Sequence, residues 1–199
     1  QIYDLNIPRD GVTVLCAAGQ KGLFGPQGTG CAVFCDDFNF SLLSPSEFGG
    51  SGFASADITM GHTAPESYEA GTVNVPGIVG LGEGIRYVRS LGTDRILSHE
   101  KAMFSLAKKG LSDIDGVKIY LPDREGGVLL FNFEGMSGSA LSAQLADEGI
   151  CTRPGLHCAP TAHEGLGTGG DAVRISFSAF TSPEDIYSFC SATKRLCRR

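Results

Sequence analysis

A single lysine stands in a glycine-rich turn, where it could do covalent chemistry. Lys21 lies in the segment AGQKGLFGPQGTG, residues 18–30, which follows a short apolar run. Glycines permit tight turns and let the backbone approach an anion or a cofactor closely. Lys21 could therefore form a Schiff base with a carbonyl cofactor, or it could be a solvated loop residue without a role. The pattern alone favours the second alternative, and the missing GK[ST] ending excludes a phosphate loop.

Cys158, in the segment GLHCAP, is the cysteine whose surroundings favour reactivity. A reactive thiolate needs a partly exposed setting with positive charge or hydrogen-bond donors. The long loop expected over residues 153–170 supplies His157 beside the cysteine and His163 five residues later. A loop cysteine without a role is the alternative, and the residues leave both open. We expect the remaining thiols to be mostly buried, at Cys16, Cys31, Cys35, Cys151, Cys190 and Cys197.

Arg174 is a charge on the polar side of an otherwise apolar strand, AVRISF. Such an arginine costs desolvation free energy unless it meets a carboxylate. That carboxylate could be structural or could belong to a substrate, and a structural partner is the default. Ser51 in FGGSG and the segment over residues 68–74 offer hydroxyl and backbone donors to a phosphate, a weak signal by itself.

Several other kinds of site and partner fit the sequence poorly. The four histidines lack HxxxH or HExxH spacing and no two cysteines form CxxC, so we predict no metal site. The segment GMSGS around Ser137 lacks the second glycine of a hydrolase nucleophile elbow. A net charge of −6 argues against nucleic acid as the main partner. No apolar run is long enough to span a bilayer, and the unpaired cysteines indicate a reducing, cytoplasmic compartment.

The elements that must position these residues alternate between strands and helices. Strands are expected over 11–17, 31–35, 117–121, 128–133, 150–153 and 172–180. Helices are expected over 77–91, where Gly80, Gly82 and Gly84 imply close packing, over 93–109 with Thr93 as cap and Gly110 as stop, and over 139–148. A last helix is expected to begin with Ser182 as cap, Pro183 at its first position and Glu184 and Asp185 in its first turn. The stretch 38–76 is expected to be an ordered loop with a function. This order predicts an α/β part followed by a compact α+β domain, with the boundary near residue 92.

Five segments together resemble the class V aminotransferase family of pyridoxal 5'-phosphate (PLP) enzymes, in its cysteine desulfurase and selenocysteine lyase branch. In chain order they are AGQKGLFGPQGTG, GGSG, YEAGTVNVPGIVGLGEGI, TRPGLHCAP with the following TAH, and AVRISF. The resemblance implies the C-terminal part of a fold-type I PLP-dependent transferase. Residues 1–92 would then be the end of the large PLP-binding α/β domain, and residues 93–199 the small C-terminal α+β domain.

The same resemblance implies roles for individual residues. Lys21 would carry PLP as a Schiff base and move the proton at the substrate α-carbon, while Gln20 and Ser51 would contact the cofactor phosphate. Cys158 would attack the sulfur of L-cysteine, giving L-alanine and a persulfide for a sulfur-acceptor protein. Arg174 would hold the substrate carboxylate. The serine at the position of Ser51 often serves the other subunit in this family, which implies a homodimer.

Two departures from the family pattern keep alternatives open. Gln20 and Ala18 stand where the family has His and Ser or Thr, and Ala18 has no side-chain donor for the cofactor phosphate. The family's ring-stacking His, pyridine-pairing Asp and nearby Gln lie far before the lysine, so the resemblance implies that this chain lacks them. The alternatives are a selenocysteine lyase or other class V enzyme, and a non-catalytic fragment or degenerate paralogue. An iron–sulfur scaffold, a tRNA-modifying relay or a selenium pathway would each fit as the acceptor.

Overall fold

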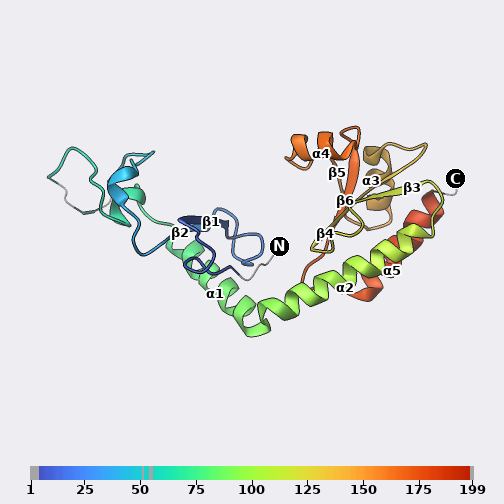
Figure 1. The fold of residues 1–199 in the computed structure, drawn as a ribbon, viewed down its shortest axis with the longest axis horizontal. Coiled ribbons are helices and arrows are strands. Elements are labelled where there is room, and N and C mark those ends of the chain that lie inside the picture. Colours follow the sequence, from blue (N-terminus) through green and yellow to red (C-terminus); the bar gives the residue numbers. More distant parts are fainter. Residues whose placement is uncertain (1–4, 51, 54–55, 198–199) are drawn as a thin grey trace. The chain divides into compact units, whose positions relative to one another are not determined.

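The computed structural model describes residues 5–50, 52–53 and 56–197, which form two compact units (Figure 1). The first unit ends at Leu91 and the second begins at Gly92. The first contains a strand hairpin, two short 3-10 helices and one long helix, and the second contains a four-stranded sheet with four helices. Ser51 lies outside the described residues.

The hairpin of the first unit consists of β1 (Val14–Ala18) and β2 (Gly30–Phe34), which pair antiparallel. The bounds of β1 differ from the predicted strand by three residues at the start and one at the end, and those of β2 differ by one residue at each end. The long segment that follows holds the 3-10 helices η1 (Phe40–Leu42) and η2 (Glu66–Tyr68), and α1 (Val75–Leu91) closes the unit.

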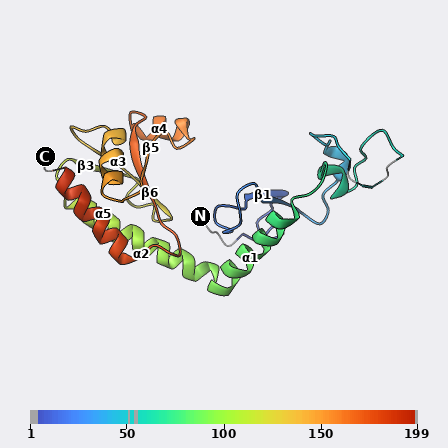
Figure 2. The ribbon, with the colours of Figure 1, turned by 180° about the vertical axis from the view of Figure 1, so that it is seen from behind.

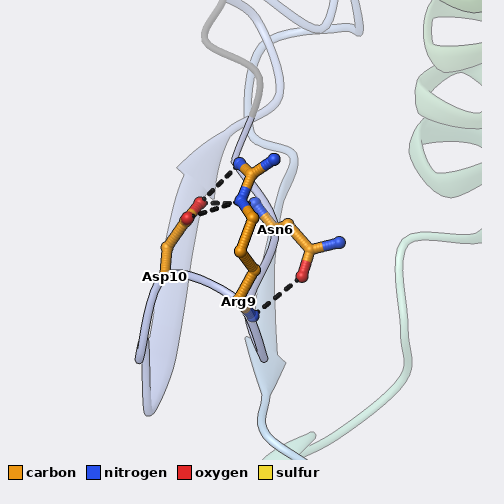
Figure 3. A network of polar contacts seen from close by, with 3 residues as sticks. All are labelled: Asn6, Arg9 and Asp10. Carbon is orange, nitrogen blue, oxygen red and sulfur yellow. Dashed lines mark hydrogen bonds and ion pairs between the residues drawn. The ribbon is translucent and has the colours of Figure 1, made fainter.

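A turn before β1 is closed by its own side chains (Figure 3). The Arg9 guanidinium donates to the Asp10 carboxylate from Nε at 2.7 Å and from Nη2 at 2.9 Å. The Asn6 backbone N–H donates to the same carboxylate at 2.8 Å, and the Arg9 N–H donates to the Asn6 side chain at 2.9 Å. The Arg9 guanidinium holds the pKa of Asp10 below its ordinary value. Asp10 therefore has a structural role in this turn.

Aromatic rings anchor part of the long segment after β2. Phe34, Phe38 and Phe40 lie with ring centroids 4.8–4.9 Å apart, and Tyr68 joins them 5.6 Å from Phe40. The Tyr68 hydroxyl lies 2.8 Å from the Leu43 carbonyl oxygen, to which it donates. This cluster ties η1 to η2 across many residues that have no regular secondary structure.

The glycines of α1 let the helix lie directly on the turn that carries Lys21. A Cβ added at Gly84 would run into the Leu23 carbonyl, and one at Gly80 would lie 2.7 Å from Pro26 Cγ. Gly80, Gly82 and Gly84 predict close packing of this helix, and the structure confirms it at Gly80 and Gly84. Gly82 is different, because a Cβ there would meet nothing within 4 Å.

The second unit is built on an antiparallel sheet in the order β3-β4-β6-β5. Its strands are β3 (Val117–Tyr120), β4 (Val128–Phe133), β5 (Arg153–Gly155) and β6 (Ala172–Ser176). Its helices are α2 (Thr93–Ser112), α3 (Gly138–Asp147), α4 (Pro160–Leu166) and α5 (Pro183–Leu196). Helices α2 and α5 lie side by side (Figure 2).

One apolar core holds this second unit together. Fully buried side chains from β4, α3 and β6 meet those of α2 and α5, among them Phe104, Phe131, Leu141, Leu145 and Val173. Helix α5 begins as predicted, with Ser182 as cap and Pro183 in its first turn. Ser182 and Asp185 form a reciprocal capping box there.

The structure corrects two boundaries in this unit. Thr93 is predicted as the cap of α2 and Gly110 as its stop, but Gly92 is the cap and the helix continues to Ser112. Gly110 lies inside α2, where a Cβ would sit 2.5 Å from Cys190 Sγ on α5, so the glycine permits close packing of the two helices. Residues 153–170, predicted as one long loop, contain β5 and α4.

Two alanine substitutions in α1 should separate helix propensity from packing. Gly82→Ala should raise the free energy of unfolding by about 1 kcal/mol, because alanine favours the helix and its methyl group enters open space. Gly84→Ala should lower it by about 1–3 kcal/mol, because the methyl group collides with the Leu23 backbone. Urea denaturation of both variants checks this, and equal stabilisation by the two would refute the packing.

Candidate functional site

The register of β5 and β6 places two arginines directly opposite each other. Arg153 on the edge strand β5 pairs with Arg174 on β6. Directly opposed side chains of an antiparallel pair share one face of the sheet, where like charges repel. Neither arginine forms an ion pair within the described part of the chain, and Arg174 Nε is buried there without a hydrogen-bond partner. The pair has the charge and the unused donor that an anion would satisfy.

Cys158 lies beside this arginine pair. The Arg153 Nη2 atom is 3.7 Å from Cys158 Sγ, and the thiol is exposed. The chain reaches this position through two consecutive residues with left-handed backbone, His157 at φ 54° and Cys158 at φ 59°. The Ala159 N–H closes the turn by donating to the Leu156 carbonyl at 2.9 Å.

The two predicted histidines lie close together, but they do not hold the thiol. His157 Nε2 is 2.7 Å from the Arg153 carbonyl oxygen, and His157 Nδ1 is 2.9 Å from His163 Nε2. Both ring nitrogens of His157 are therefore occupied. The cation at the Cys158 sulfur is Arg153. The predicted strand over 150–153 included this residue, but the observed strand is Arg153–Gly155, and the pairing with β6 that brings Arg153 to the site depends on a distant contact.

A cavity of about 430 Å³ opens next to these residues. Arg174 and His157 line it together with apolar side chains from β4 and α4, including Val128, Leu130, Ala162 and Leu166. Burial, followed by the positive charges of Arg174 and Arg153, lowers the pKa of His157 below 6.5 and outweighs the hydrogen bond to the Arg153 carbonyl, which raises it. The ring is therefore neutral at pH 7, and the positive charge at this cavity comes from arginine.

Lys21 lies in the other unit, at the exposed tip of the connection between β1 and β2. Backbone hydrogen bonds hold the connection, from the Gly19 N–H to the Thr29 carbonyl and from the Gly25 N–H to the Gly19 carbonyl, both at 2.8 Å. The Lys21 amine has no side-chain partner among the described residues, and Gln20 beside it is exposed. The turn is thus held by its own backbone hydrogen bonds while its lysine is exposed.

The glycines of this turn serve a purpose that their sequence pattern did not reveal. The space that a Cβ would fill is taken by Thr29 at Gly19, by Leu81 at Gly25 and by the Ala17 carbonyl at Gly30. These three glycines let the hairpin and α1 pack against the turn. The interpretation that they admit a cofactor to the backbone is not needed to explain them.

The expectation of mostly buried thiols is wrong. Cys16, Cys151 and Cys158 are exposed, and the other four cysteines are half-buried. Two of those four differ chemically, because burial raises the pKa of the Cys190 and Cys197 thiols to about 11. In the described part of the chain no cluster of three or more histidine, cysteine or acidic residues could hold a metal ion. No helix there is long and apolar enough to cross a membrane.

Comparisons with known proteins match nearly the whole chain. The profile of the family described as Aminotransferase class-V matches residues 3–189. Probable cysteine desulfurase 1 of Mycobacterium leprae is 33% identical over 197 residues, covering 96% of this chain and 31% of that protein. A probable cysteine desulfurase of Pyrococcus abyssi is 30% identical, covering 92% of this chain and 46% of that protein.

Solved structures give the same picture. The apo structure of a cysteine desulfurase from Thermococcus onnurineus NA1 superposes with a TM-score of 0.86 at 29% identity, covering 98% of this chain and 50% of that one. The predicted fold, α/β and part of a fold-type I PLP-dependent transferase, is confirmed by these neighbours. The chain spans roughly a third to a half of the length of the relatives described here.

The cysteines should differ in their reaction with iodoacetamide at pH 8. Cys151 and Cys158 are exposed and should be alkylated, whereas Cys190 and Cys197, with pKa values of about 11, should not. Only about one in a thousand of the latter thiols is ionised at this pH. Peptide mass spectrometry reports each site, and rapid labelling of Cys190 in the native protein would contradict the structure.

Removing the Arg153 guanidinium should slow alkylation of Cys158. Arg153→Gln leaves the backbone carbonyl that binds His157 but takes away the charge that attracts an anionic sulfur. A unit charge about 4 Å away in water corresponds to a loss of roughly fivefold. The rate at Cys151 in the same sample serves as the internal control, and equal rates at Cys158 in both proteins would show that the contact has no effect.

Proposed function

Because this chain belongs to the class-V aminotransferase family, we propose that it forms part of a PLP-dependent cysteine desulfurase. The relatives from Mycobacterium leprae and Pyrococcus abyssi, 33% and 30% identical to this chain, are named as probable cysteine desulfurases. The proposed reaction removes sulfur from L-cysteine, releases L-alanine and leaves a persulfide on Cys158.

One observation carries this proposal. The exposed Cys158 thiol lies beside Arg153, which is opposite Arg174 in the sheet, and neither arginine has an acidic partner in the described chain. Arg174 is half-buried with an unused donor, which suits a substrate carboxylate. Arg153 reaches from the opposite strand to the Cys158 sulfur. A bound amino acid held by its carboxylate would thus have a nucleophilic thiol nearby.

The residues of the glycine-rich turn fit PLP in type. Lys21 offers a free primary amine on a rigid turn, which suits attachment to an aldehyde, and the adjacent Gln20 amide can donate to a phosphate oxygen. Ser51 is proposed as a further phosphate contact. When bound, PLP would supply an electron sink that stabilises negative charge at the substrate α-carbon.

Each residue of this chain then has a definite task. Lys21 Nζ holds the cofactor and afterwards moves a proton at the substrate α-carbon. The Arg174 guanidinium orients the substrate through its carboxylate. Cys158 Sγ attacks the substrate sulfur, so that an S–S bond forms and the substrate C–S bond breaks.

The reaction balances without an added oxidant or reductant. The electron pair of the broken C–S bond stays with the carbon skeleton, which takes up a proton and leaves as L-alanine. Cys158 keeps the sulfur as a persulfide. Because the thiol is exposed, a sulfur-acceptor protein could collect the sulfur, and we propose such a partner together with a homodimeric, cytoplasmic enzyme.

The fold alone does not decide the reaction. A solved complex of a cystine C-S lyase with cysteine persulfide shares the fold, with a TM-score of 0.76 at 18% identity. Cys158 beside Arg153 favours sulfur transfer over simple transamination, because transamination needs no thiol. Selenocysteine would present the same carboxylate and amine to Arg174 and Lys21, so selenocysteine lyase is the second candidate.

Lys21→Ala should abolish cofactor attachment. Purified protein given PLP should show the visible absorbance band of a lysine-bound cofactor, and this variant should lose the band. Lys101→Ala, which removes an exposed lysine from α2, should keep it. If neither this chain nor a longer protein containing it shows the band, the proposed enzyme fails and a non-catalytic role takes its place.

Cys158→Ala should abolish sulfide release from L-cysteine in the presence of a reductant and leave the PLP absorbance unchanged. The thiol is needed only to accept sulfur, and Lys21 holds the cofactor. Cys151→Ala removes another exposed thiol seven residues away and should retain activity within about twofold. Full desulfurase activity in Cys158→Ala would show that another group accepts the sulfur.

A further inference from the structure

A row of hydrogen bonds runs from Thr168 through two histidine rings to the backbone of β5. Thr168 Oγ1 is 2.7 Å from His163 Nδ1, and His163 Nε2 is 2.9 Å from His157 Nδ1. His157 Nε2 is 2.7 Å from the Arg153 carbonyl oxygen. His163 and Thr168 are each only 4% exposed. Neither ring of this relay is needed by the reaction as described above.

The Arg153 end of the relay fixes the order of its protons when both rings are neutral. The Arg153 carbonyl can only accept, so His157 Nε2 carries a proton, and in the neutral ring His157 Nδ1 must accept. His163 therefore donates from Nε2 and accepts at Nδ1 from the Thr168 hydroxyl. The Gly170 N–H, which can only donate, lies 3.2 Å from the Thr168 oxygen. The Thr168 hydroxyl has the His163 carbonyl oxygen, 3.5 Å away, as a second and more distant acceptor. Every donor meets an acceptor in the arrangement that the Arg153 carbonyl sets.

The relay fastens the strained turn that presents Cys158. Two successive non-glycine residues with φ near +55° cost free energy and persist only where their surroundings hold them. His157 is the first of them, and its ring is fixed at both nitrogens. At the far end, the Asn132 side chain of β4 donates to the Thr168 carbonyl at 3.2 Å, which connects the relay to the central sheet.

We propose that Thr168, His163 and His157 form a proton-ordered relay that positions the Cys158 thiol beside Arg153, which makes Thr168 a positioning residue for sulfur transfer. This inference rests on the proposed function. Thr168 touches no reacting atom, and it acts by fixing the tautomer and orientation of His163, which in turn fixes His157.

The charges around the relay favour its neutral form. Burial, followed by the charges of Arg174 and Arg153, keeps the pKa of His157 below 6.5 although the hydrogen bond to the Arg153 carbonyl opposes this shift, and His163 is the other titratable group that contacts the ring. A proton added to His157 Nδ1 would remove the acceptor of the His163 N–H and reverse the order of the whole relay. Because the folded pKa is below the unfolded one, the contribution of this ring to stability is present above pH 6.5 and is lost as the pH falls below it.

A matched pair of substitutions at Thr168 tests the relay. Thr168→Val keeps the shape but removes the hydroxyl, whereas Thr168→Ser keeps the hydroxyl. In the PLP-loaded protein, Thr168→Val should lower kcat for sulfide release about 10- to 100-fold, because small misplacements of a reacting group have effects of that size. KM for L-cysteine should stay within about twofold, and Thr168→Ser should resemble the wild type. Equal kcat values for wild type and folded Thr168→Val would overturn the proposal.

Two further readouts do not depend on the proposed enzyme activity. Nitrogen NMR of histidine-labelled wild-type protein should show both His157 and His163 protonated at Nε2 and bare at Nδ1. Thr168→Val should change the His163 signals and the alkylation rate of Cys158 relative to Cys151. A wild-type His157 protonated at Nδ1 would refute the relay even if the valine variant failed to fold. The expected NMR result with no desulfurase activity would refute the proposed function and leave the relay intact.

Discussion

The repulsion between Arg153 and Arg174 is the constraint on which the candidate site depends. Antiparallel pairing sets the two arginines opposite each other, and the described chain supplies no acidic partner to either. An anion bound to such a pair would relieve the repulsion between its charges. Arg153 already lies against Cys158, and Arg174 retains a buried, unused donor. Stability and proposed chemistry are therefore two consequences of one strand register.

The packing of the second unit holds that register. Val173 and Ile175 alternate with Arg174 along β6 and enter the core, so slipping the strand by one residue would bury the guanidinium and expose both apolar chains. The edge strand β5 is only three residues long and contains a proline, so it cannot hold the site by ladder hydrogen bonds alone. The histidine relay supplies a second attachment for the segment that follows it.

Local signals in the sequence predicted local features well. The sequence from Ser182 to Asp185 contains the cap, the proline and the acidic first turn of α5, all of which need only neighbouring residues. Lys21 and Cys158 could be singled out by type and setting, and their proposed roles came from a resemblance over five segments. Arg174 could be singled out as a charge on an otherwise apolar strand. Its lack of an acidic partner could not be predicted, because that depends on the folded surroundings.

Features set by distant contacts were missed. Glycine is typical of a helix end, so Gly110 was predicted as the stop of α2. It lies inside the helix instead, packed against Cys190, eighty residues later in the chain. The place of Arg153 depends on the β5–β6 register, and the pairing of His157 with His163 depends on a short helix inside a stretch expected to be loop. Pro160 and Gly167 were available as start and stop signals for that helix.

The central claim is that Cys158 receives the sulfur of L-cysteine. The most direct test incubates the PLP-loaded protein with L-cysteine in the absence of reductant and examines each cysteine-containing peptide by mass spectrometry. The account predicts one added sulfur atom on the Cys158 peptide and none on the Cys151 peptide. Alanine accumulating while Cys158 stays unmodified, or sulfur appearing on another cysteine first, would contradict it.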